Sequence, residues 1–336
     1  MINNNYFSIP DLKKIVIIGA CPNIDEIIRI NKKLKIQTII VTSKNQKKFF
    51  RKNIKLNLFD DLDNSKFHKF VKENCKIDNT IFLSISSMFI FSLKTINFLN
   101  GNLINYFPSR LPYDAGRGGF SWHIMREDRI LNNLFHIIDK DMNTGPIIIN
   151  DAKIFPSNCK VPLDYENFKW DEMNKLYAYF IKKVKNGDKF FLTEQANTIG
   201  RFNPALNTLI NGFIDWNMKS YDLYNFINAF DEPHSGASTY INNKKIGKVF
   251  IKKVHLHGGD TPNHPYMAGI VSRHDKNWIV VCTSSKHMLL IEEVLDRSGK
   301  NIISKIKVGD RFYSPQNELD LPKSRRVYFN SMGKKK

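Results

Sequence analysis

The stretch Asn105–Gly119, "NYFPSRLPYDAGRGG", has the polar, turn-rich composition of an active-site loop. It holds no histidine, no cysteine and a single acid, Asp114. General acid–base and nucleophilic chemistry depend on such groups. The stretch is therefore either a catalytic loop that has lost its proton carriers or a loop that does its chemistry with other groups.

A second polar segment, "HLHGGDTPNH" (255–264), holds three histidines and an aspartate, which are metal ligands by type. It lies between expected strands far from the first loop, and we predict no metal site there. The four cysteines, at 21, 75, 159 and 282, are widely spaced and form no CxxC pair. They suggest neither a zinc site nor a disulfide framework, and with no visible signal peptide they favour a reducing cytoplasm.

The first 150 residues alternate between strand and helix patterns, which predicts an α/β fold with a doubly wound, mostly parallel sheet. Apolar runs typical of buried strands lie at 13–20, 36–43, 79–86, 101–107, 133–139 and 146–151. Ligands bind at the carboxyl ends of strands in such sheets, where the loops after Ile104 and Ile138 are expected. The turn "GACPN" has one glycine, which disfavours a dinucleotide.

The second half of the chain has a different character. An amphipathic helix is expected at 170–187, closed by Gly187. After an irregular linker at 197–212, one helix and several short, evenly spaced strands predict a smaller C-terminal β-barrel-like domain. We therefore predict domains at 1–205 and 206–322, followed by a basic tail at 323–336.

The formal net charge of +19 limits the classes of binding partner to consider. It is compatible with a polynucleotide or with an anionic small substrate such as a nucleotide. The lysines are scattered, however, and the only tight cluster is the terminal "GKKK", so a general compositional bias is favoured over a polynucleotide partner as the explanation of the charge. The apolar runs are far too short to span a membrane.

Two loop stretches, "INYFPSRLPYDAGRGGFSW" (104–122) and "FHIIDKDMNTGPIII" (135–149), resemble the folate-dependent formyltransferases. The family pattern is approximately N-x-H-P-S-x-L-P-x-x-x-G followed by H-x-x-D-x-x-x-D-T-G-x-I. Its C-terminal domain is similar to "NGFIDW" (211–216), "INAFDEPHSGASTY" (227–240) and "VGDRFYSP" (308–315). The resemblance covers nearly the whole chain and implies a Rossmann-like formyltransferase domain with a C-terminal β domain.

This resemblance implies transfer of a formyl group from N10-formyltetrahydrofolate, a co-substrate, to an amine. In the family an Asn stabilises the oxyanion, while a His and an Asp move protons. Asn105 matches the Asn, but Phe107 stands at the His position and Asn143 at the Asp position. The loop thus keeps its shape residues and lacks its proton carriers. Positioning alone, with a deprotonated amine and a water, would still permit slow catalysis.

Two titratable residues also match family positions. Asp139 matches an earlier acid and is a candidate proton carrier, although a turn-stabilising acid is the alternative. His136 is more typical of a structural, hydrogen-bonded histidine. The resemblance therefore assigns Asn105, Phe107, Asp139 and Asn143 as the catalytic positions. It assigns the donor pocket to Ser109, Arg110, Leu111, Pro112, His136, Thr144 and Gly145.

The acceptor is predicted from a difference between this sequence and the tRNA enzyme of the family. The basic segment 41–57 is short and lacks the Pro/Gly-rich insertion with which the tRNA enzyme grips the acceptor stem. We therefore expect a small amine, a nucleotide-linked amino sugar. Arg110 and Arg117 would bind its phosphates or the glutamate of the folate, and a role in surface solubility alone is the alternative. Two alternatives stay open: a catalytically inactive binding protein, and a methionyl-tRNA formyltransferase relative. A homodimer also stays open.

Overall fold

The computed structural model describes residues 5–116, 119–196, 201–243 and 246–325. The chain forms two compact units. The first contains residues up to Ala115, 130–154 and 167–201, and the second contains 116–129, 155–166 and the rest of the chain from Phe202. Two short segments before residue 205 thus group with the second unit. The predicted boundary at 205 remains a prediction.

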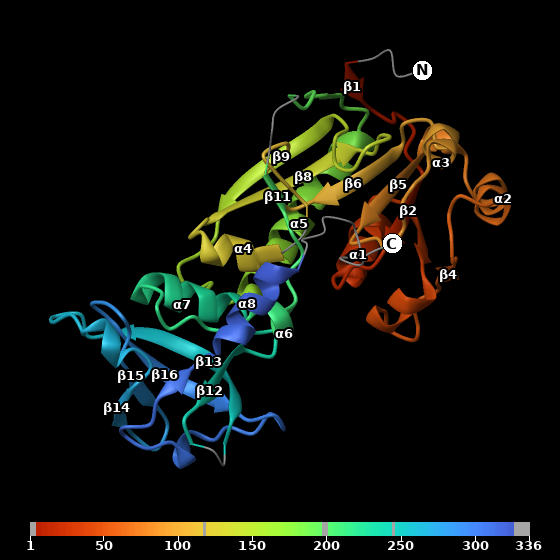
Figure 1. The fold of residues 1–336 in the computed structure, drawn as a ribbon. Coiled ribbons are helices and arrows are strands. Elements are labelled where there is room, and N and C mark those ends of the chain that lie inside the picture. Colours follow the sequence, from red (N-terminus) through yellow and green to blue (C-terminus); the bar gives the residue numbers. More distant parts are fainter. Residues whose placement is uncertain (1–4, 117–118, 197–200, 244–245, 326–336) are drawn as a thin grey trace. The chain divides into compact units, whose positions relative to one another are not determined.

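The first unit is built on a seven-stranded sheet in the order β4-β3-β2-β5-β6-β8-β9 (Figure 1). Five strands are parallel: β2 (Lys14–Gly19), β3 (Gln37–Thr42), β4 (Asn57–Leu58), β5 (Thr80–Ile85) and β6 (Leu103–Phe107). Two are antiparallel to their neighbours: β8 (Ile130–Ile137) and β9 (Ile147–Ile154). This confirms the predicted α/β class and mostly parallel sheet.

One expectation about strand ends was wrong. We placed the loops after Ile104 and Ile138 at the same edge of the sheet, as the carboxyl ends of parallel strands. Because β8 runs antiparallel to β6, its end lies beside the start of β6, where the Ile138 N–H donates to the Leu103 carbonyl at 2.9 Å. Cross-strand register, and not a shared strand direction, brings the two stretches together.

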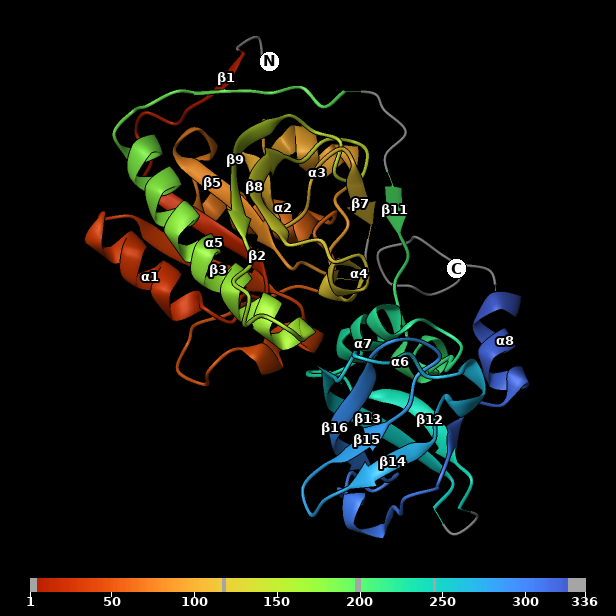
Figure 2. The same cartoon turned by 90° about the vertical axis from the view of Figure 1, so that its left-hand side faces the viewer.

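Helices cover both faces of this sheet because side chains alternate along its buried strands. Ile15 and Ile17 pack with α1 (Ile24–Lys33) and α5 (Pro162–Lys185). Val16 and Ile18 pack in a second cluster with residues on and after α2 (Ser65–Asn74) and α3 (Leu93–Phe98). Figure 2 shows α1 and α5 on the near face of the sheet. The predicted closure of α5 by Gly187 is confirmed, since this glycine has φ +86°, but the helix begins earlier than predicted, at Pro162.

Short elements complete the first unit. The strand β1 (Tyr6–Phe7) pairs antiparallel with β10 (Phe190–Phe191), which follows α5. The 3-10 turns η1 (Lys44–Phe49) and η2 (Ile77–Asn79) lie between strands. Two further short strands, β7 (Asp114–Gly116) and β11 (Arg201–Asn203), lie where the chain passes from the first unit to the second.

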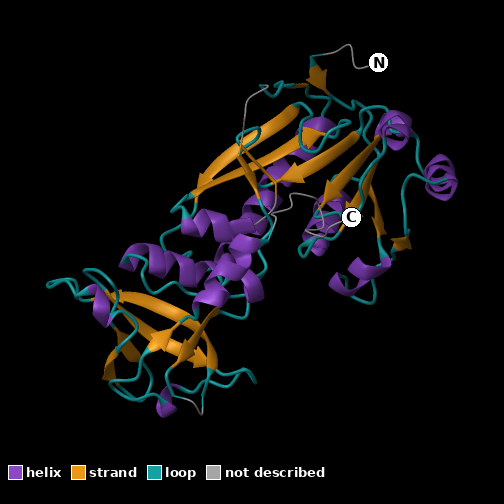
Figure 3. Ribbon diagram, viewed as in Figure 1, coloured by secondary structure: helices purple, strands orange, loops and turns teal. Residues whose placement is uncertain are grey.

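The second unit contains one antiparallel sheet in the order β14-β15-β16-β13-β12-β17 (Figure 3). Its edges meet, because the Phe312 N–H donates to the Gly269 carbonyl and the Val271 N–H to the Asp310 carbonyl, both at 2.8 Å. The predicted barrel-like domain is therefore confirmed. The strands are β12 (Ala237–Ile241), β13 (Lys248–His257), β14 (Val271–His274), β15 (Ile279–Val281), β16 (Met288–Leu295) and β17 (Phe312–Tyr313).

Helices of the second unit flank this sheet. They are α4 (Gly119–Met125), α6 (Thr208–Asn211), α7 (Ser220–Ala229) and α8 (Gln316–Ser324), with the 3-10 turns η3 (Pro265–Met267) and η4 (Ile303–Lys305). Ser121 of α4 donates from its hydroxyl to the Ala229 carbonyl of α7 at 2.7 Å. Of the predicted tail, residues 326–336 lie outside the described part. Within the described residues, no helix is both long enough and apolar enough to cross a membrane.

Candidate active site

The pairing of β6 with β8 places Asn105 directly opposite His136. The Asn105 Nδ2 and the His136 Nε2 lie 3.2 Å apart, within hydrogen-bonding distance. Both residues come from the two stretches in which the sequence predicted the chemistry. The structure therefore brings these stretches together at a single cross-strand pair.

The hydrogen bonds of His136 determine whether its Nε2 donates to Asn105 or accepts from it. Its Nδ1 lies 2.8 Å from the Ile137 carbonyl, which can only accept, so Nδ1 carries the hydrogen. Nε2 is then an acceptor and binds one N–H of the Asn105 amide. His136 is thus a buried, hydrogen-bonded histidine, as predicted, and it leaves the second N–H of Asn105 available to another acceptor.

Burial also controls the charge of His136. Removal from water lowers the pKa of this imidazole, although hydrogen bonds with Ile137 and Asn143 and the charge of Asp139 act in the opposite direction. The net direction is downward, so His136 is neutral around neutral pH. A neutral ring agrees with the acceptor role of Nε2.

Phe107 stands beside His136 as an apolar neighbour. The two rings are edge-to-face, with centroids 6.4 Å apart. Phe107 cannot exchange a proton, so it contributes packing at the position where the family pattern has a histidine. The sequence-predicted positions Asn105, Phe107 and Asn143 therefore all interact with one residue, His136.

Asn143 lies in the hairpin between β8 and β9, in a left-handed conformation with φ +60°. Asparagine adopts this region more readily than most residues. Two positions later the chain packs tightly: a Cβ on Gly145 would lie 2.0 Å from the Ile137 carbonyl oxygen. Glycine is required at 145 because of this close approach, and it allows the hairpin to fold back toward His136.

The Asp139 carboxylate forms hydrogen bonds within the same hairpin. One of its oxygens, Oδ1, accepts from the Thr144 hydroxyl at 2.6 Å and from the Asp141 N–H at 3.3 Å. These bonds support the turn-stabilising alternative for Asp139, and they engage Thr144 in the turn as well. A role for Asp139 in proton transfer stays a prediction.

The loop after β6 is held by its own polar groups. The Ser109 hydroxyl donates to the Asp114 carbonyl at 2.9 Å, and the Asp114 N–H donates to the Arg110 carbonyl at 2.6 Å. Leu111 is buried, and the bond between Leu111 and Pro112 is cis. Arg110 is exposed, with its guanidinium 4.7 Å from the Tyr113 ring centroid. Of the predicted pocket residues in this loop, Arg110 is therefore the one with a charged group open to a ligand. Arg117 lies outside the described residues.

Sequence reasoning missed Gln195, which contacts the hairpin between β8 and β9. Its Nε2 donates to the Asn143 carbonyl at 3.0 Å and to the Gly145 carbonyl at 2.7 Å. It lies about fifty residues downstream, beyond α5, in a segment without a recognisable motif. No local signal in the sequence indicates this contact.

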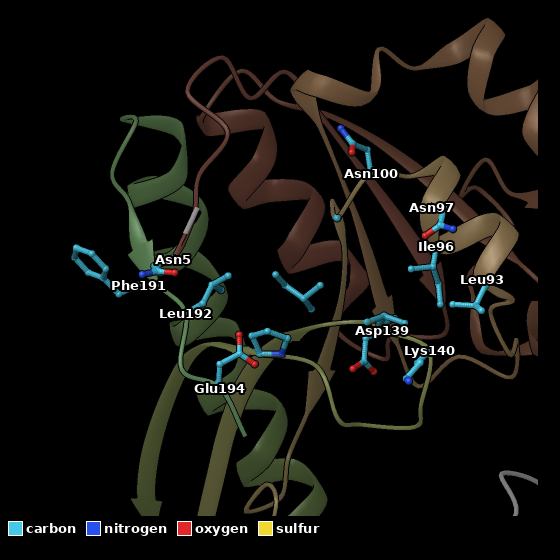
Figure 4. Close-up of a pocket in the computed structure, with 14 residues that line it drawn as sticks. Asn5, Leu93, Ile96, Asn97, Asn100, Asp139, Lys140, Phe191, Leu192 and Glu194 are labelled. Carbon is cyan, nitrogen blue, oxygen red and sulfur yellow. The ribbon is translucent and has the colours of Figure 1, made fainter. Parts of the chain in front are cut away.

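A cavity of about 950 Å³ lies in the first unit beside Asp139 (Figure 4). In Figure 4, Asp139 and Lys140 face residues of α3 across it, and Leu192 and Glu194 lie on another side. Apart from Asp139, the sequence did not single out the residues of its walls, because they come from segments far apart in the chain. It is lined by Asn5, Leu93, Ile96, Asn97, Asn100, Gly101, Ile137, Ile138, Asp139, Lys140, Pro146, Phe191, Leu192 and Glu194.

The walls of this cavity combine apolar and hydrogen-bonding groups. Leu93, Ile96 and Ile138 offer apolar surface, and the carboxylates of Asp139 and Glu194 accept hydrogen bonds. Small-molecule sites combine apolar walls with polar groups that fix orientation, and this cavity has both kinds of residue in similar numbers. A flat heterocycle with N–H groups along one edge fits the pattern. Among the described residues no group of three or more metal-ligating side chains is suited to hold a metal.

Comparison with known proteins finds a family match in the C-terminal part of the chain. Residues 208–306 match the family described as formyl transferase, C-terminal domain. Over 201 residues the chain is 23% identical to methionyl-tRNA formyltransferase of Clostridium perfringens strain 13. This match covers 59% of the present chain and 61% of that enzyme. The chain thus matches less than two thirds of the curated relative's length.

Solved structures share the fold over more of the chain. WlaRD, a sugar 3N-formyltransferase crystallised with dTDP and 5-N-formyl-tetrahydrofolate, superposes with a TM-score of 0.57 at 19% identity, covering 84% of this chain and 97% of that one. An N-formyltransferase of Helicobacter canadensis, solved with folinic acid and dTDP-3-aminofucose, gives 0.53 at 18% identity, covering 84% and 99%. A 4-N formyltransferase of Francisella tularensis gives 0.56 at 18%, covering 68% and 92%.

A mostly parallel α/β sheet followed by a small β-barrel, with an asparagine presented on β6, defines the formyltransferase fold in this molecule. The matched C-terminal domain, the curated relatives and the fold together confirm the resemblance seen in the sequence. Residues 208–306 thus match the formyl transferase C-terminal domain, and the chain shares the fold of solved sugar N-formyltransferases.

Proposed function

We propose that this protein transfers a formyl group from N10-formyltetrahydrofolate to the amine of a small acceptor, a nucleotide-linked amino sugar. The observation that carries the proposal is the Asn105 amide. It is fixed by His136 with one N–H still available, in the motif where the family has its oxyanion donor. A fixed donor of this kind stabilises the charge that develops during acyl transfer.

The cavity beside Asp139 supports a folate donor. Its volume and mixed walls suit a pterin, whose amino and ring N–H groups would donate to Asp139 or Glu194 while the ring packs on Ile96 and Ile138. Three relatives were solved with folate compounds: WlaRD, the Helicobacter canadensis enzyme and HypX of Aquifex aeolicus. Ser109, Leu111, Pro112 and Thr144 would then shape the neighbouring loops, and Arg110 would face the acceptor.

The reaction requires little from the protein beyond position and charge stabilisation. The acceptor nitrogen forms a bond to the formyl carbon, and the carbonyl oxygen becomes an oxyanion that accepts from Asn105. The bond from carbon to N10 then breaks. The amine loses one proton and N10 gains one. With Phe107 and Asn143 at the usual proton-carrier positions, we propose that water carries these protons, with Asp139 as a candidate base.

The acceptor is inferred from relatives and from charge. The proteins with the same fold include sugar formyltransferases solved with dTDP or with a dTDP-linked amino sugar. Arg110, exposed and stacked on Tyr113, offers a guanidinium and an aromatic face, which suit a phosphate and a base respectively. The curated relatives act on methionyl-tRNA, so the tRNA is the second acceptor to test.

The direct test is single-turnover formyl transfer from N10-formyltetrahydrofolate to a panel of dTDP-amino sugars and to charged initiator tRNA. A formylated sugar is the expected product. Calorimetric titration with 5-formyltetrahydrofolate measures donor binding independently of the acceptor. If the folded protein binds no folate compound and formylates nothing in the panel, the proposal is wrong.

A second candidate function rests on Phe107 and Asn143: a binding protein that has lost catalysis. It predicts that the double variant Phe107→His, Asn143→Asp creates transfer where the natural protein has none. If the double variant instead slows a measurable natural rate, the native residues are a working set and the binding-protein hypothesis fails.

A further inference from the structure

Gln195 is attached to the part of the hairpin that matters most for the site. Its side-chain amide donates one N–H to the carbonyl of Asn143 and the other to the carbonyl of Gly145. Both N–H groups of the amide are therefore used on a single turn. These carbonyls belong to the residue at the family's acid position and to the glycine that folds the turn against Ile137.

The backbone around Gln195 is itself fixed to the start of β9. Thr193 and Ile147 exchange a pair of backbone hydrogen bonds, each 2.9 Å long, so the segment is held in antiparallel register. Side chains alternate along such a segment. Leu192 and Glu194 line the cavity, while Gln195 reaches the hairpin.

The same short segment thus contacts both halves of the proposed site. Asp139 and Lys140 of the hairpin form one wall of the cavity, and Leu192 and Glu194 form another. Asn143, on the same hairpin, interacts with His136, which holds Asn105. Gln195 therefore connects the segment that lines the cavity to the hairpin that carries Asn143.

We propose that Gln195 is a positioning residue: it fixes the hairpin so that Asn143 stays at His136, and it links the donor cavity to that position. Asn143 has a left-handed backbone with φ +60°, which asparagine adopts more readily than most residues, and the two hydrogen bonds from Gln195 hold this turn in place. The effect of Gln195 on catalysis rests on the proposed formyl transfer. Its role in fixing the hairpin is independent of that function.

Gln195→Leu tests the proposal, since leucine has a similar volume and no N–H. We expect backbone hydrogen exchange in the segment 139–146 to become about tenfold faster or more, because two hydrogen bonds on one turn are lost. We also expect weaker binding of 5-formyltetrahydrofolate, and kcat lowered by about 10- to 100-fold, as small displacements of reacting groups produce. Gln195→Glu should behave like Gln195→Leu, because a carboxylate offers no N–H to either carbonyl.

The matched control is Gln46→Leu. Gln46 also donates from its Nε2 to a backbone carbonyl, that of Ser86, at 2.8 Å. This variant should lower the unfolding free energy without changing exchange in 139–146. If Gln195→Leu and Gln46→Leu leave the hairpin equally protected, Gln195 does not position it and the proposal is overturned. Hydrogen exchange tests whether Gln195 positions the hairpin even if the natural protein shows no formyl transfer. Failure of the proposed function is therefore distinguishable from failure of the positioning role.

Discussion

At the scale of single residues, the site is organised around a histidine that carries no charge. His136 interacts with Asn105, Phe107 and Asn143, and its two ring nitrogens have different roles, one donating and one accepting. Compared with the family pattern, Phe107 and Asn143 replace two titratable side chains beside His136. The hydrogen bonds of His136 are nevertheless present. The Asn105 amide, the predicted oxyanion donor, therefore keeps its hydrogen bond in a site with few titratable groups.

The first prediction concerns Asn105. Replacing it with alanine removes the oxyanion donor, and we expect kcat to fall by about 10²- to 10³-fold with little change in donor affinity. Single-turnover kinetics and calorimetry measure the two quantities separately. Asn57→Ala is the control, because Asn57 also donates from Nδ2 to a backbone carbonyl, that of Ile40, on a distant edge of the sheet. Equal rates in the two variants would contradict the assigned role.

The second prediction concerns the pH dependence of stability. Burial lowers the pKa of His136, so the unfolded chain binds a proton at a higher pH than the folded one. Stability is unaffected above the unfolded pKa of about 6.5 and is lost as pH falls below it, by up to about 1.4 kcal/mol per pH unit for each such histidine. Urea unfolding at a series of pH values measures the slope.

His136→Gln should reduce that slope without abolishing it. The pKa values of His68 and His234 are also lowered, in each case chiefly by burial, so these residues contribute to the slope that remains. An unchanged slope in the variant would show that His136 titrates alike in the folded and unfolded states.

At the scale of elements, the hairpin between β8 and β9 depends on close backbone packing. A Cβ at Gly145 would meet the Ile137 carbonyl, so we expect Gly145→Ala to cost about 1–3 kcal/mol or more of unfolding free energy. Gly187→Ala is the matched control. It adds a Cβ at φ +86° with nothing within 4 Å, and should cost about 1 kcal/mol from backbone strain alone.

Urea unfolding gives both losses, and donor binding provides a second measurement. Only Gly145→Ala should weaken binding of 5-formyltetrahydrofolate, because only this glycine belongs to the hairpin that lines the cavity. Similar losses of stability, with unchanged binding in both variants, would show that the hairpin adapts to the extra carbon and that the tight packing is unimportant.

At the scale of the whole molecule, the formal charge of +19 raises the question of nucleic acid. We expect binding to initiator tRNA and to an unrelated RNA of equal length to be alike, and to fall at least tenfold between about 50 and about 200 mM salt. Fluorescence anisotropy at several salt concentrations measures this. A clear preference for initiator tRNA that persists at the higher salt concentration would favour the tRNA acceptor over the amino sugar.

Much of the fold was predictable because the signals are local. Apolar runs identified the strands of both units, and the glycine at 187 marked the end of α5. The direction of β8 was not predictable, because an apolar strand reads the same parallel or antiparallel. That single reversal decides how Asn105 meets His136.

The sequence by itself determined the two domain types, the motif residues and the loss of proton carriers at 107 and 143, since these depend on residue type and spacing. Only the tertiary structure decided that Phe107 and Asn143 both adjoin His136, that Gln195 holds the hairpin, and that α3 and the segment 190–194 enclose a cavity. Such contacts join residues tens of positions apart. They depend on strand register and packing, for which no short stretch of sequence carries a signal.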